Sequence, residues 1–143
     1  RLSASFSGQA KMNLQSVTGY TSSGESRSRL YGDATLNIDF ENEIVSGDIV
    51  NLLLRAPGQD YDDASDHAGK ILLNETEISA SGFQGTLLAD TAATDSLDIT
   101  GLDGGYSGVF FGPAADQIGL TLEAEVSTTE GTELGIGGGV LSR

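Results

Sequence analysis

Hydrophobic and polar residues alternate along most of this chain. In residues 34–41, apolar side chains at even positions face polar ones at odd positions, and residues 118–126 repeat the pattern. Successive side chains of a strand point to opposite faces, so each stretch predicts a strand with one face on a core and one in water. The leading core candidates are Leu36, Ile38, Phe40, Leu120 and Leu122.

The same pattern predicts eight or nine strands along the chain. They are expected near residues 2–16, 32–41, 44–54, 69–79, 82–89, 96–101, 105–111, 118–128 and 133–141. No stretch keeps a helical period over three turns, so less than about a tenth of the chain should be helical. Closing the sheet removes its unpaired edges. We therefore expect an all-β fold, a single up-and-down antiparallel β-barrel of eight or nine strands with a filled interior, spanning residues 1–143; a sandwich is the alternative.

The predicted connections differ in length. Those at 41–43, 79–82 and 101–104 are short, whereas those at 17–30, 55–68 and 89–95 are long. Successive connections of an up-and-down barrel lie at alternate ends, which would gather the long loops on one rim. That rim would carry the predicted partner-binding residues Tyr20, Arg27, Arg29, Tyr61 and His67. Tyrosine and arginine are enriched in binding hot spots, so we expect partners at the rim rather than on the wall, unless the long loops are merely tolerated insertions.

Charge and composition exclude several classes of function. Twenty-one acidic residues against seven basic ones give a net charge of −14, which repels nucleic acid and anionic membrane surfaces. No run of eighteen apolar residues is present, so no membrane-spanning helix is expected. The chain has no cysteine, which excludes disulfides and thiol chemistry. Its twenty glycines are dispersed, as is typical of many turns between short strands.

Candidate catalytic and metal-binding groups are few. His67 is the only histidine, which excludes a Ser-His-Asp triad and a multi-histidine metal site, so no catalytic or metal residue is assigned and no enzyme is expected. As a haem ligand, His67 would need an apolar slot and a second ligand such as Met12. The aspartates between Asp60 and Asp66 lack the EF-hand pattern. No cofactor is assigned; haem and weakly held calcium stay open, with a solvated loop histidine as the simpler explanation of His67.

Carboxylates at positions 123 and 125 form the outer face of one strand. Glu123 and Glu125 are two residues apart, so both point to solvent if Leu122 and Ala124 face the core. We interpret them as a charged outer wall rather than an acid/base pair.

Four segments resemble one bacterial family. The most specific, Gly108 to Gly119 (GVFFGPAADQIG), is similar to its Gly-x-Phe-Phe-Gly-Pro-x-Ala-x-Glu-x-Gly-Gly signature, although Leu120 replaces the second glycine. Segments 32–47, 78–85 and 134–143 are similar to further strands. Together they resemble the barrel of transferrin-binding protein B and its relatives, which include surface lipoproteins and soluble haem-scavenging proteins. Within the motif, Gly108 and Gly112 would leave room for two phenylalanines on opposite faces, and Pro113 would stop the strand.

The resemblance carries expectations about function. It implies an eight-stranded barrel, non-enzymatic binding and a location outside the cell or on the bacterial outer surface. The implied partner is an iron-carrying host-type protein or haem, in a role in iron acquisition. The alternative is a structural or adhesive barrel module of a larger exported surface protein.

Overall fold

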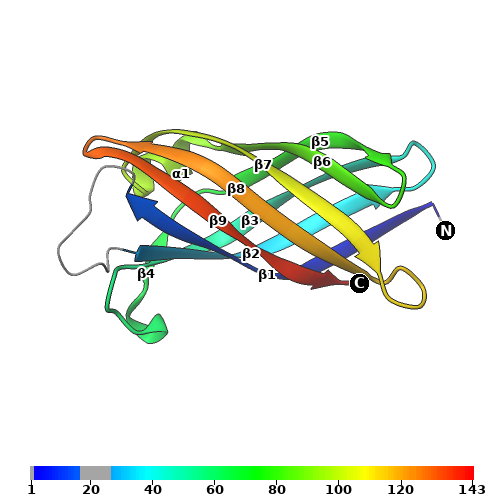
Figure 1. The fold of residues 1–143 in the computed structure, drawn as a ribbon, viewed down its shortest axis with the longest axis horizontal. Helices are drawn as coiled ribbons and strands as arrows, with labels where there is room; N and C mark the ends of the chain where they lie inside the picture. Colours follow the sequence, from blue (N-terminus) through cyan, green and yellow to red (C-terminus); the bar gives the residue numbers. More distant parts are fainter. Residues whose placement is uncertain (1, 17–26) are drawn as a thin grey trace.

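The computed structural model describes residues 2–16 and 27–143, with the side chain of Arg27 excepted. One antiparallel sheet closes into a barrel (Figure 1). Its eight strands are β1 (Ser3–Ser16), β2 (Arg27–Asp39), β3 (Ile44–Arg55), β5 (Ile71–Ser79), β6 (Gly82–Ala89), β7 (Ile99–Phe111), β8 (Gln117–Thr128) and β9 (Gly131–Ser142). Each strand pairs with the next along the chain, and β9 returns to pair with β1. The predicted up-and-down barrel is confirmed.

Three short elements complete the fold. The ninth strand, β4 (Ser65–His67), extends the sheet by pairing with residues 52–54 of β3, beyond the part of β3 that pairs with β5. The 3-10 turn η1 (Tyr61–Asp63) precedes it, and helix α1 (Thr91–Ser96) lies where a loop was predicted. Asp90 starts α1, because its carboxylate accepts a 2.8 Å hydrogen bond from the Ala93 N–H. The low helical content is confirmed, and no helix in the described segments is long and apolar enough to cross a membrane.

The turn predicted at residues 101–104 is wrong. The two strands expected at 96–101 and 105–111 form one continuous strand, β7. Gly104 allows β7 and β8 to pack closely and does not form a turn. A Cβ at this position would lie 2.6 Å from the Cα of Ala124 on β8. As expected, the strand stops before Pro113, since β7 ends at Phe111.

The other two predicted tight turns are confirmed. One joins β5 to β6 through Ala80, which has a left-handed φ of 56°. The other joins β2 to β3, where Asp39 accepts hydrogen bonds from the side chain (2.8 Å) and the backbone N–H (3.0 Å) of Asn42. These bonds favour the ionised carboxylate and lower the pKa of Asp39.

Inward-facing side chains fill the barrel. Four of the five leading core candidates, Leu36, Ile38, Leu120 and Leu122, are buried. The prediction for Phe40 is wrong. This ring is only half-buried and packs against the edge of the core. It follows the last residue of β2, where the guanidinium of Arg143 covers one of its faces at 5.8 Å from the ring centroid. No polar or charged residue is buried among those the structure describes.

The connections alternate between the two ends of the barrel as predicted. The connection between β3 and β5 and the one between β6 and β7 share one end, on the left in Figure 1, where β1 ends and β2 begins. The tight turns after β2 and β5 lie at the other end, with the β7–β8 connection. Merging the two predicted strands into β7 leaves the long connections, which all precede it, at one end, but it reverses the ends at which the β7–β8 and β8–β9 connections lie. The long connections therefore flank one mouth of the barrel.

Candidate binding site at the long-loop end of the barrel

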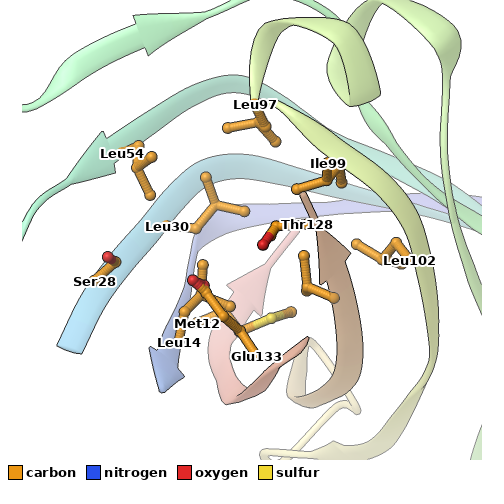
Figure 2. A pocket seen from close by; sticks show the side chains of 11 residues that line it. Met12, Leu14, Ser28, Leu30, Leu54, Leu97, Ile99, Leu102, Thr128 and Glu133 are labelled. Carbon is orange, nitrogen blue, oxygen red and sulfur yellow. The ribbon is translucent and has the colours of Figure 1, made fainter. Parts of the chain in front are cut away.

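The barrel interior is not completely filled at the long-loop end. A cavity of about 80 Å³ remains there, and Figure 2 shows side chains from several strands converging on it. Its lining, from six strands and the end of α1, consists of Met12, Leu14, Ser28, Leu30, Leu54, Leu97, Ile99, Leu102, Val126, Thr128 and Glu133. Eight of these side chains are apolar. We call this cavity the apolar socket.

The size and lining of the apolar socket limit what it can accept. Small-molecule sites usually have volumes of roughly 300–1,000 Å³, so this cavity is too small for a cofactor. Its polar groups are the hydroxyls of Ser28 and Thr128 and the carboxylate of Glu133. Leu97 and Leu102 are only partly buried, so apolar surface remains accessible there. The arrangement suits one aliphatic side chain inserted from outside.

Tyr61 lies on the outer wall of the barrel rather than over its mouth. Its ring packs edge-to-face on Tyr31 of β2, with centroids 4.9 Å apart, and its hydroxyl accepts a 3.2 Å hydrogen bond from Nε2 of Gln9 on β1. The connection between β3 and β5 therefore folds back along β1 and β2. Tyr31 is buried as a result, whereas 44% of Tyr61 stays exposed.

His67 joins two of the long connections. Its Nδ1 lies 2.9 Å from the carbonyl oxygen of Ser96 in α1, and its Nε2 lies 2.9 Å from Oγ of Ser65. With the proton on Nδ1, the ring donates to Ser96 and accepts from Ser65. The backbone N–H of Ala68 also donates to Oγ of Ser96, at 3.0 Å. His67 is thus a bonded link between β4 and α1 rather than a solvated loop residue.

The predicted site residues separate into groups. Arg29 pairs in register with Arg55 of β3 and is two residues from Tyr31, so Arg29 and Tyr61 share the outer wall of β2. His67 contacts α1 instead and shares no partner with Tyr61. Tyr20 and the side chain of Arg27 lie outside the described residues. The structure therefore groups Arg29 with Tyr61, but not with His67.

The apolar socket does not follow from the pattern of apolar residues along the chain. A strand at 96–101 followed by a turn at 101–104 does not predict that Leu97, Ile99 and Leu102 converge with β1 and β2. Alternation does not connect Ile99 with Leu102, which are three residues apart, and the irregularity in the pairing of β7 with β8 between Ile99 and Gly101 is not visible in the sequence.

Neither His67 nor Met12 is placed to ligate haem in this structure. Both ring nitrogens of His67 already have hydrogen-bond partners, and Met12 lines a cavity too small for a porphyrin. Among the residues with described positions, no three His, Cys, Asp or Glu side chains are placed to hold a metal ion. The aspartates at 60, 62, 63 and 66 are all exposed.

Comparison with known proteins places the chain in a family. The family profile described as the C-lobe and N-lobe β-barrels of Tf-binding protein B matches residues 2–138. A solved mutant of transferrin-binding protein B from Haemophilus parasuis has a TM-score of 0.56 and 14% identity, covering 98% of this chain and 26% of that one. The protein from serogroup B Neisseria meningitidis has a TM-score of 0.52 and 18% identity, covering 100% and 25%.

The solved proteins are much longer than this chain, and their sequences differ from it at most positions. The chain spans about a quarter of the length of these solved proteins, and at this identity the structural likeness establishes the fold. No curated protein matches the sequence. The profile match covers nearly the whole chain, including the Gly108–Gly119 motif. The chain therefore belongs to the family of transferrin-binding protein B β-barrels.

Proposed function

We propose that this chain is a non-enzymatic binding module, secreted or displayed on the bacterial outer surface, that captures an iron-carrying protein of the transferrin kind. The solved relatives are named as transferrin-binding proteins, which supports this class of partner. The observation that carries the proposal is the apolar socket, which lies at the end of the barrel that holds the β3–β5 and β6–β7 connections. The opposite end is built from shorter connections.

The chemistry of the long-loop end suits a protein partner better than haem. Binding hot spots commonly place one apolar or aromatic anchor in a well-packed pocket, surrounded by polar contacts. The apolar socket would receive an aliphatic side chain of the partner. Tyr61 and Arg29, on the adjacent outer wall, would supply contact area and directed hydrogen bonds. The net charge of −14 would favour a partner surface with basic residues.

Capture of iron-loaded and iron-free transferrin by the immobilised chain tests the proposal. Tyr61→Ala and Arg29→Ala should each weaken capture by about tenfold, as expected for a lost anchor worth roughly 1.4 kcal/mol. Phe111→Ala is the matched control, because Phe111 is 41% exposed at the opposite end while Tyr61 is 44% exposed. Equal losses in all three variants would contradict the long-loop end as the binding face.

A parallel absorbance titration with haem separates the remaining alternatives. We expect no shift of the Soret band, since the described residues offer haem no slot. A shift at stoichiometric haem would make haem the ligand instead. Failure to capture either form of transferrin, together with an unchanged haem spectrum, would favour the structural or adhesive module.

A further inference from the structure

Two exposed aliphatic side chains lie beside acidic ones on the outer wall of the barrel. Leu134 and Ile136 of β9 are 50% and 68% exposed. Glu125 of β8 pairs in register with Leu134, and Glu123 pairs with Ile136. With Asp103 of β7, these side chains line an open groove of about 300 Å³. We call the two Glu–aliphatic pairs the acidic ladder.

No cation lies on the strands of the acidic ladder, and the nearest one on a paired strand is Lys11 of β1, opposite Gly138 of β9. Residues 99–142, which include β7, β8 and β9, contain no lysine or arginine. Within the described part of the chain, the one ion pair joins Lys70 to Asp48, away from these strands. Asp103 also pairs in register with Glu125, and like charges in directly opposite positions destabilise a sheet. A basic partner would neutralise the repelling carboxylates, and it would also cover the exposed aliphatic side chains.

The spacing of the acidic ladder matches an extended chain. Glu123 and Glu125 are two residues apart on one strand, which separates them by about 6.8 Å along it. An extended peptide with lysine or arginine at every second position carries its charges at the same interval. The long aliphatic stems of these residues can lie on apolar side chains while the charged heads reach the carboxylates.

We propose that the acidic ladder binds an extended basic segment of a partner protein, with lysine or arginine at alternate positions. The aliphatic stems would contact Leu134 and Ile136, and the cationic heads would pair with Glu125 and Glu123. A second copy of this barrel is a poor occupant, because two such acidic faces repel each other. This surface is separate from the apolar socket and does not depend on transferrin being a partner.

A terminally blocked peptide of alternating lysine and threonine provides the test. Its binding to the purified chain can be measured by fluorescence anisotropy at physiological salt. Glu123→Gln together with Glu125→Gln should weaken binding at least about fivefold, through the loss of two charge pairs. Glu75→Gln together with Glu77→Gln is the matched control, because these exposed residues have the same spacing on β5. The control should change binding by less than about twofold.

A second pair of variants tests the aliphatic contacts. Leu134→Ser together with Ile136→Ser should weaken peptide binding, whereas Val140→Ser, at a 55% exposed position of the same strand, should not. Equal losses from both glutamate pairs would overturn the proposal, since binding would then follow net charge alone. Unchanged binding in the Leu134/Ile136 variant would overturn it too. Transferrin capture by the same variants is scored separately, so failure here leaves the proposed function intact.

Discussion

The ring of Phe83 occupies the space that a side chain at Gly108 would need. The two residues pair in register across β6 and β7, and a Cβ at position 108 would lie 2.7 Å from Cε1 of Phe83. Phe83 in turn packs edge-on against Phe110, with centroids 5.8 Å apart. The sequence motif suggested that this glycine makes room for the phenylalanines that follow it. In the structure it makes room for a ring on the neighbouring strand.

Replacing Gly108 with alanine should therefore destabilise the barrel. The added methyl group would force the Phe83 ring out of its position, at about 1–3 kcal/mol of unfolding free energy. Gly119→Ala is the control, since its Cβ would meet its nearest neighbour at an ordinary 3.6 Å and should change stability by less than about 0.5 kcal/mol. Urea unfolding of both variants measures the difference, and equal stabilities would argue against this close approach.

Two phenylalanines should differ in their contribution to stability. Phe6 is completely buried, so Phe6→Ala should lower the free energy of unfolding by about 3–5 kcal/mol. Phe40→Ala should have a smaller effect, because this ring is partly exposed and less apolar area is lost from the core. Chemical denaturation of the two variants tests this ranking. A larger loss at Phe40 would contradict it.

Tyr106 should make stability depend on alkaline pH. Its hydroxyl donates to the carbonyl oxygen of Asn74, and burial raises the pKa of Tyr106 to about 12. The unfolded chain ionises near its ordinary pKa of about 10, so this stabilisation is complete below that pH and is lost as pH rises toward 12. Melting temperatures across this range should fall less steeply in Tyr106→Phe. Tyr61→Phe, at an exposed ring, should retain the wild-type slope.

Ser96 should hold the backbone after β4 in place. Its Oγ accepts the Ala68 N–H and lies 3.1 Å from Nδ1 of His67. Ser96→Ala should speed amide exchange at Ala68, through loss of a hydrogen bond worth about 0.5–1.5 kcal/mol. Thr94→Ala removes a hydroxyl that donates only to Thr91 within α1. The same acceleration in both variants, seen by hydrogen exchange, would assign the effect to the helix instead.

The sequence by itself determined the strand faces and the ends of the barrel. Alternation is a local property of each strand, which is why Leu36, Ile38, Leu120 and Leu122 were correctly placed inside. The order of the connections likewise predicted that residues 55–68 and 89–95 share an end, because antiparallel strands reverse direction at every connection. The strand faces and the ends of the barrel could be predicted because both depend only on the order of residues and elements along the chain.

Tertiary structure decided how the strands approach one another and what the long connections contact. Gly104 continues β7 with Ala124 of β8 packed closely against it, and Tyr61 leaves the rim to pack its ring on Tyr31. The apolar socket and the acidic ladder arise in the same way, from strands distant in sequence. The register of two strands and the distance between them depend on the size and chemistry of the side chains that face each other across the pair. The alternating pattern within one strand does not specify those partners.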